Sequence, residues 1–219
     1  MAAATLTKAR RPGARRKRGA YAKSRQTREK ILAAALKVAG GAGLHGASVA
    51  AIADQAGVAI GNLHYHFGSR DELLYELMRW QVAELLETVR KAIDAHDDFF
   101  AKDEAAFRAY LEYVRRHPAC VRLAEEVRLH HPKLYDATNA MWLAMFRDAL
   151  REGVARGQLR PMRADEIGVL AHLLMGTRYF VDQMILAGGG SGPSDELVVG
   201  AYVRLTRGGL GHRPPGGRS

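Results

Sequence analysis

Apolar residues recur at intervals of three or four along most of this chain, and no stretch sustains an alternation of apolar and polar residues. Residues 24–39 show the pattern first, with Ile31, Leu32, Ala35, Leu36 and Val38 on one side. Such spacing is typical of amphipathic helices and not of strands. It predicts an all-α fold of about nine helices. Breaks at Gly, Pro and capping residues give their expected ranges: 24–39, two short helices within 48–67, then 69–95, 103–116, 119–130, 134–156, 164–187 and 194–207.

The segment from Ser48 to Arg70, SVAAIADQAGVAIGNLHYHFGSR, predicts two short helices joined by a tight turn. Ser48 is placed to cap the first helix. Gly57 is placed to end it, because glycine tolerates the positive φ found just past a helix end. Leu63 and Phe67 would pack the second helix back onto the first. A helix-turn-helix with this layout braces itself with its first helix and inserts the second in the major groove of DNA.

Residues Arg28 to Leu73 also resemble the TetR family of transcriptional repressors. The similarity lies in REKILAAALKVA, followed by SVAAIADQAGVAIGNLHYHFGSRDEL. The chain departs from the family pattern at three positions. Ala59 replaces a polar cap of the recognition helix, which could cost about 1 kcal/mol of local helix stability. His64 stands where the family usually has Tyr, and Arg70 where it usually has Lys.

The outward side of the second short helix, together with the resemblance, predicts how the domain would touch DNA. Asn62 is expected at a base-reading position, with Ile60 and Gly61 close to base edges. Phosphates are expected to be held by Ser48, His64, Tyr65, His66 and Arg70. Val49, Arg25 and Arg28 complete the predicted DNA-binding set.

The positive charge of the chain is concentrated at its N-terminus. Residues 1–30 hold eleven Lys or Arg and one acid, Glu29, whereas the rest carries 22 basic and 22 acidic side chains. We expect residues 1–23 to be a disordered basic arm that follows phosphates or lies in a minor groove. A solvated tail is the alternative. The cluster at 15–18 would also suit a nuclear address in a eukaryote, but the family resemblance and the Ala, Arg and Gly bias favour a bacterial source.

Three further ranges are predicted to follow the arm. Residues 24–69 would form the helix-turn-helix domain, 70–208 a helical domain for effector binding and dimerisation, and 209–219 a flexible tail. A single cysteine, Cys120, cannot form an internal disulfide, which suits a reducing compartment. No apolar segment resembles a signal peptide or approaches the ~18 residues of a membrane span. A cytoplasmic protein is therefore expected.

The expected helix at 164–187 is apolar around most of its circumference, and such a helix must be covered on all sides. A homodimer would cover it, with the last two helices of each subunit forming a four-helix interface. The resemblance implies the same interface. Leu173, Phe180 and Val199 are predicted to lie in it. Burial inside one subunit is the alternative.

The helical domain also offers large, polarisable side chains that could line a ligand cavity, which the resemblance places chiefly among the fourth to eighth helices. No buried Lys/Arg cluster is evident, so an apolar or aromatic, weakly polar effector is expected. The alternative is that these residues are plain core. The predicted lining is Gln81, Phe107, Tyr110, Trp142, Met145, Met175 and Tyr179.

Enzymatic function is disfavoured, because no nucleophile elbow, phosphate-binding loop or metalloprotease motif occurs. His117 and Cys120, with His130 and His131, make a metal site conceivable, but exposed histidines are ordinary at helix ends. No catalytic residue, metal or cofactor is predicted. The sequence thus predicts a ligand-responsive repressor that binds a palindromic operator as a homodimer. An architectural DNA-binding protein without an effector is the main alternative, and an enzyme using the helical cavity is a third.

Overall fold

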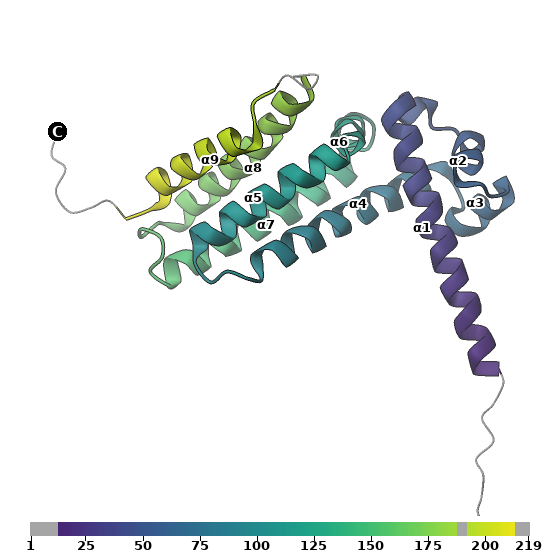
Figure 1. Ribbon diagram of the computed structural model, residues 1–219, viewed down its shortest axis with the longest axis horizontal. Coiled ribbons are helices and arrows are strands. Elements are labelled where there is room, and N and C mark those ends of the chain that lie inside the picture. The colour runs from purple at the N-terminus through teal and green to yellow at the C-terminus, as the bar shows by residue number, and fades with distance from the viewer. Residues whose placement is uncertain (1–12, 188–191, 213–219) are drawn as a thin grey trace, which may run out of the picture.

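The computed structural model describes residues 13–187 and 192–212, which form nine α-helices and no strand. The prediction of an all-α fold is therefore confirmed. Figure 1 shows a small group of helices at one end, from which a longer bundle extends. The helices are α1 (Gly13–Gly46), α2 (Val49–Ala56), α3 (Ile60–Phe67), α4 (Arg70–Ile93), α5 (Phe99–Arg116), α6 (Ala119–His130), α7 (Pro132–Ala155), α8 (Ala164–Ala187) and α9 (Asp195–Leu210).

Helices α1, α2 and α3 form the compact N-terminal group, and local sequence sets their ends. The hydroxyl of Ser48 accepts a hydrogen bond from the amide of Ala51 and caps α2. Gly57, with φ 60° and ψ 44°, ends α2 in the left-handed region. Ser69 and Glu72 form a capping box at the start of α4. The predicted helix-turn-helix is thus present, with its two short helices where the sequence indicated.

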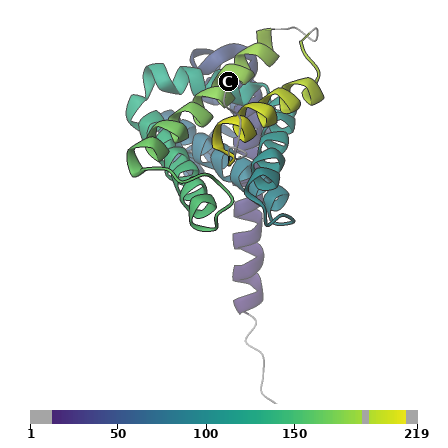
Figure 2. The same cartoon turned by 90° about the vertical axis from the view of Figure 1, so that its left-hand side faces the viewer.

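The N-terminal helix is longer than predicted. We expected disorder up to residue 23, but residues 13–23 are helical, and α1 projects well past the other helices (Figures 1 and 2). Residues 1–12 of the expected arm lie outside the described residues. The glycines at 40–43 do not end α1 either. Only Gly43 leaves helical geometry, with φ 74° and ψ 170°, and α1 continues to Gly46 beyond this kink.

Helices α4–α9, which we call the C-terminal bundle, contain a divided apolar core. A first cluster joins α1–α3 to the N-terminal half of α4 and to α6, and a second cluster joins α5, the C-terminal end of α7, α8 and α9. Buried residues that belong to neither cluster include Gln81, Tyr113, Val114 and Asp182. The first cluster crosses the expected domain boundary at residues 69 and 70, so that division of the chain stays a prediction.

Two ends in the C-terminal bundle differ from expectation. Helix α5 begins at Phe99 and not near residue 103, because the carboxylate of Asp98 accepts a hydrogen bond from the amide of Ala101 and caps it. Helix α9 continues to Leu210, whose buried side chain belongs to the second cluster. Residues 209 and 210 are therefore helical and not part of a tail, and residues 213–219 lie outside the described part. None of the described helices is long and apolar enough to cross a membrane.

Candidate nucleic-acid interface and effector region

Helix α3 buries one side and exposes the other. Leu63 and Phe67 are 1% and 5% exposed and pack into the first cluster. On the opposite side, Tyr65 is 82% exposed and Ile60 is 49% exposed, and Asn62 is also on the surface. Six of the predicted contact residues are thus on the surface of α3: Ile60, Gly61, Asn62, His64 and Tyr65 are exposed, and His66 is partly exposed.

The start of α3 has room for close approach. A Cβ atom added at Gly61 would meet nothing within 4 Å, so a base or a phosphate can come near the backbone there. Ala59 provides no side-chain cap, as expected, so the first turn of α3 has only backbone support. At the other end, His64 Nδ1 lies 3.1 Å from the carbonyl oxygen of Gly68. This contact holds the His64 ring near the end of the helix.

Two of the predicted DNA-binding arginines have structural partners. Arg70 Nε donates a hydrogen bond of 3.1 Å to the carbonyl of Ala47, which ties the start of α4 to the loop before α2. Arg28 pairs with Glu76 at 3.1 Å and lies 4.9 Å above the ring of Phe67. The contacts of Arg28 thus join α1 to both α3 and α4. Arg25 differs, because its side chain is 81% exposed and pairs loosely with Glu29.

The interior of the C-terminal bundle contains an arginine, which the sequence analysis did not anticipate. Only 13% of the Arg178 side chain is exposed, and it lies 3.6 Å from the carboxylate of Asp103. Its guanidinium lies over four aromatic rings, nearest to Phe146 at 4.5 Å from the centroid. The other three rings, at 5.8–6.0 Å, are Phe107, Tyr110 and Tyr202.

A second carboxylate lies one helical turn from Arg178. Asp182 is 6% exposed, and its Oδ2 accepts a hydrogen bond from the hydroxyl of Tyr110. Burial raises the pKa of Asp182 to about 7, although Tyr110 and Arg178 oppose the shift. Burial likewise raises the pKa of Asp103, although Arg178 and the Tyr202 hydroxyl, 2.9 Å away, act against this. We call Arg178, Asp103, Asp182, Tyr110 and Tyr202 the Arg178 cluster.

The predicted effector lining does not form one shared interior. Phe107 is fully buried core and stacks on Tyr202 with ring centroids 4.0 Å apart. Tyr179 is 37% exposed and donates a hydrogen bond of 2.6 Å to Glu125, and Met145 is 42% exposed. Of the other four, Gln81 is buried, whereas Tyr110, Trp142 and Met175 are partly exposed. The seven residues are thus split among core, cluster and surface.

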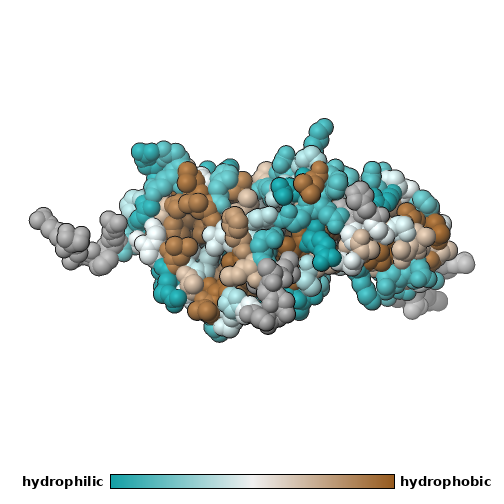
Figure 3. Space-filling view, turned by 90° about the horizontal axis from the view of Figure 1, so that it is seen from above, coloured by the Kyte–Doolittle hydropathy of each residue, from teal (hydrophilic) through white to brown (hydrophobic). Residues whose placement is uncertain are grey.

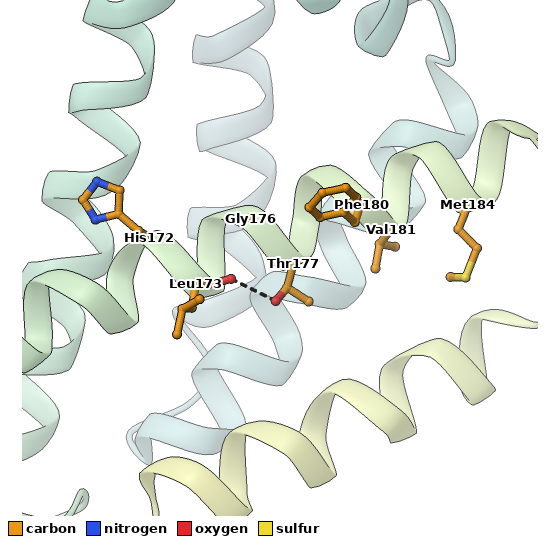
Figure 4. Close-up of a pocket in the computed structure, with 7 residues that line it drawn as sticks. All are labelled: His172, Leu173, Gly176, Thr177, Phe180, Val181 and Met184. Atoms are coloured by element: carbon orange, nitrogen blue, oxygen red, sulfur yellow. Dashed lines mark hydrogen bonds between the residues drawn. The ribbon is translucent and has the colours of Figure 1, made fainter.

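Helix α8 carries an uncovered apolar face. An open groove runs along it, lined by seven residues of this helix alone (Figure 4): His172, Leu173, Gly176, Thr177, Phe180, Val181 and Met184. Leu173 and Phe180 are 60% and 70% exposed, and on α9 Leu197 and Leu205 are also exposed. Seen from above, hydrophobic residues gather over the half of the molecule away from α1–α3 (Figure 3).

One of the predicted interface residues, Val199, does not lie at the surface. Val199 is only 1% exposed and belongs to the second apolar cluster, so it faces the interior of its own protomer. Both Val198 and Val199 are buried, because this turn of α9 packs on α5. The outward side of α9 is formed by residues such as Leu197, which is 59% exposed.

Comparison with known proteins places this geometry in a family. Residues 31–77, which include the helix-turn-helix, match the model of the tetR family of bacterial regulatory proteins. Residues 31–77 of this chain therefore form a DNA-binding domain of the TetR family. It is 30% identical over 127 residues to the transcriptional repressor KstR2 of Mycobacterium tuberculosis, a match that covers 54% of this chain and 62% of KstR2. This chain thus matches less than two thirds of the length of that relative.

Other comparisons extend over more of the chain. The transcriptional activator FasR of Mycolicibacterium smegmatis is 28% identical over 210 residues, covering 93% of this chain and 92% of FasR. The structure of the M. tuberculosis ketosteroid regulator KstR2 superposes with a TM-score of 0.63 at 23% identity, over 85% of this chain and 95% of that one. The fatty acid degradation regulator FadR of Bacillus halodurans gives 0.73 at 19% identity, over 85% and 97%. These structures establish that this chain shares their fold.

Sequence reasoning missed the Arg178 cluster, although a signal was present. Arg178 and Asp182 are four residues apart in a helix that is otherwise largely apolar, and ionisable groups in such a helix must find partners. The suggested metal site finds no support: within residues 13–187 and 192–212, no three His, Cys, Asp or Glu side chains gather as metal ligands would. Burial raises the pKa of the Cys120 thiol to about 12, so this partly exposed cysteine is protonated at neutral pH.

Proposed function

We propose that this chain is a DNA-binding transcriptional regulator that acts in the cytoplasm as a homodimer and responds to a small effector. The observation that carries the proposal is the outward side of α3, where Asn62 and Tyr65 are exposed while Leu63 and Phe67 anchor the helix from behind. A short helix presented in this way fits the major groove of B-DNA.

Within this proposal, some exposed residues of α3 contact base edges and others contact phosphates. Asn62 reads a base edge, because an amide can donate to and accept from adenine at once. Ile60 and Gly61 lie beside it, where the open backbone lets a base approach. Tyr65, His66 and the cap residue Ser48 hold phosphates, which fixes the register without reading sequence. Arg70 and Arg28 contribute mainly by bracing the helices of the N-terminal group, given their contacts with Ala47 and Glu76.

The N-terminal extension supplies affinity for the phosphate backbone. Arg15, Arg16, Lys17 and Arg18 fall in the part of α1 that projects beyond the domain (Figure 2). A helical segment is too wide for the minor groove, which is about 6 Å across, so we propose that this part of the arm follows phosphates from outside. Such contacts are independent of sequence and weaken with salt.

The dimer would form through the uncovered sides of α8 and α9. Leu173, Phe180 and Met184 leave on α8 an apolar surface that water would otherwise hydrate. A second copy of the same chain would cover it by two-fold symmetry, which is the usual arrangement of homodimers. Two α3 helices related by that symmetry would read the half-sites of a palindromic operator.

We further propose that the C-terminal bundle binds an apolar effector and that binding releases the operator, which makes the protein a repressor. The divided core of the bundle supports an interior site, because polar residues such as Gln81 and Asp182 are buried but belong to neither cluster. Two similar structures are of a ketosteroid regulator and a fatty acid degradation regulator, and both names suggest apolar molecules. The effector would act by binding the DNA-free conformation better than the DNA-bound one.

Selection from random-sequence DNA tests the proposal. The purified chain should enrich a palindrome, bind it as a dimer, and prefer it to random DNA by about 10³-fold or more. Bound DNA without a shared motif, held with equal affinity whatever its sequence, would instead indicate an architectural protein.

A further inference from the structure

The Arg178 cluster contains buried polar atoms whose hydrogen-bonding capacity is unused. Asp182 Oδ1 and Arg178 Nε have no hydrogen-bond partner among the described residues. Leaving such atoms unpaired in an interior costs free energy, so most buried polar atoms are paired. Two unpaired atoms one helical turn apart, an acceptor and a donor, therefore point to a group that the chain itself does not supply.

The charges of the cluster restrict what that group can be. Arg178 is the single cation, and it faces two carboxylates, Asp103 at 3.6 Å and Asp182 one turn along α8. Four aromatic rings also turn toward the guanidinium, and the faces of such rings carry negative potential. The arginine is thus already neutralised. An incoming anion would meet two carboxylates, whereas a hydrogen-bond donor would meet an empty acceptor.

The surroundings of the cluster suit an apolar molecule. Phe146 and Tyr110 are only partly buried beside Arg178, and Trp142 lies one turn before Phe146 on α7. Within α7 only Leu150 and Gly153, near its C-terminal end, are buried. The long N-terminal part of α7 is therefore at most partly buried, and a ligand could settle against it without opening a dense core.

We propose that the Arg178 cluster selects the effector, with Asp182 accepting a hydrogen bond from a hydroxyl or amine of an otherwise apolar ligand that carries no negative charge. This inference rests on the proposed function, because it assumes that the C-terminal bundle binds a ligand. It adds the chemical class of that ligand and names the side chain that discriminates.

Four ten-carbon probes test the inference on the full-length protein: 1-decanol, decylamine, 1-methoxydecane and decanoate. Binding can be followed by calorimetry and by the fluorescence of Trp142 and Trp80. At a pH near 8, where Asp182 is ionised, the alcohol and the amine should bind about tenfold or more tightly than the ether and the carboxylate. Decanoate binding as tightly as decanol would overturn the inference.

Two substitutions assign the preference to Asp182. Asp182→Leu removes the acceptor and should bind all four probes with nearly equal affinity, whereas Asp148→Leu, the same exchange at an exposed position of α7, should keep the preference. Asp182→Asn keeps the fold even if leucine does not, and it should lose the preference for the amine while retaining the alcohol. A preference that survives in both Asp182 variants would refute the assignment.

Probe binding tests this inference, and operator binding tests the proposed function. If no probe binds the wild-type chain, the cluster is a structural network and the inference is wrong. Operator binding measured on the same samples then shows separately whether the DNA-binding function stands.

Discussion

The contact between α1 and α6 gives a sharp prediction, because the start of α6 lies against the backbone of α1 at Gly40. A Cβ atom added at Gly40 would lie 2.1 Å from the Cβ of Ala119, far inside any real contact. Arg122 Nη1 donates to the carbonyl of Gly40 at 2.9 Å and holds the two helices together. The adjacent Gly41 is also in α1, but a Cβ there would meet nothing within 4 Å. The two glycines therefore differ in packing and little else.

Alanine substitution at these neighbours should change stability in opposite directions. Replacing a helical glycine by alanine stabilises a protein by about 0.5–1 kcal/mol, and Gly41→Ala should show that gain. Gly40→Ala should instead destabilise the protein, because overpacking at Ala119 costs about 1–3 kcal/mol and outweighs that gain. For a chain of this size, about 1 kcal/mol moves the midpoint of thermal unfolding by roughly 2–4 °C.

Thermal melts followed by circular dichroism measure the difference, and a compensating change identifies its cause. Ala119→Gly removes the opposing Cβ, so the double variant Gly40→Ala/Ala119→Gly should recover most of the stability lost by Gly40→Ala. A Gly40→Ala variant as stable as Gly41→Ala would refute the close α1–α6 packing. So would a double variant that is no better than Gly40→Ala.

Three further predictions concern charge, assembly and the arm. Burial raises the pKa of Asp182 to about 7 from its ordinary value of about 3.9, so the unfolded chain releases this proton first. Stability should therefore fall, by up to about 4 kcal/mol, as the pH rises from about 4 to 7, and urea titrations should show a weaker fall for Asp182→Asn. Leu173→Glu should give folded monomers in light scattering that bind DNA weakly, whereas Val199→Glu should unfold the protomer because Val199 is buried; a dimeric Leu173→Glu variant would contradict the interface. Deleting residues 1–20 should flatten the dependence of log affinity on log salt while keeping operator preference, and an unchanged slope would make the arm a solubilising tail.

Local signals were sufficient to predict the helix-turn-helix. Ser48, Gly57 and the Ser69–Glu72 capping box act within a few residues of themselves, so their effects can be read without knowing the fold. The same is true of Leu63 and Phe67, whose spacing alone turns them to one side. The start of α1 was missed because charge and scattered glycines suggested disorder, yet Arg and Lys are good helix formers and continue the helix back to Gly13.

Positions that depend on packing between distant helices were less predictable. Val199 looks like any apolar residue of a terminal helix, and only the contact of α9 with α5 decides that it faces inward. Phe107 and Tyr179 were grouped by residue type, but the Tyr202 ring buries the first and Glu125 holds the second at the surface. The Arg178 cluster combines α5, α8 and α9, and Asp103 and Arg178 are far apart in sequence.

The central claim is that α3 reads DNA sequence through Asn62 while Tyr65 holds the backbone. The direct measurement is the affinity of Asn62→Ala and Tyr65→Ala for the selected operator and for random DNA at one salt concentration. Asn62→Ala should lose about 1–3 kcal/mol on the operator and little on random DNA, whereas Tyr65→Ala should weaken both alike. Equal losses on both DNAs for Asn62→Ala would contradict a sequence-reading role for α3.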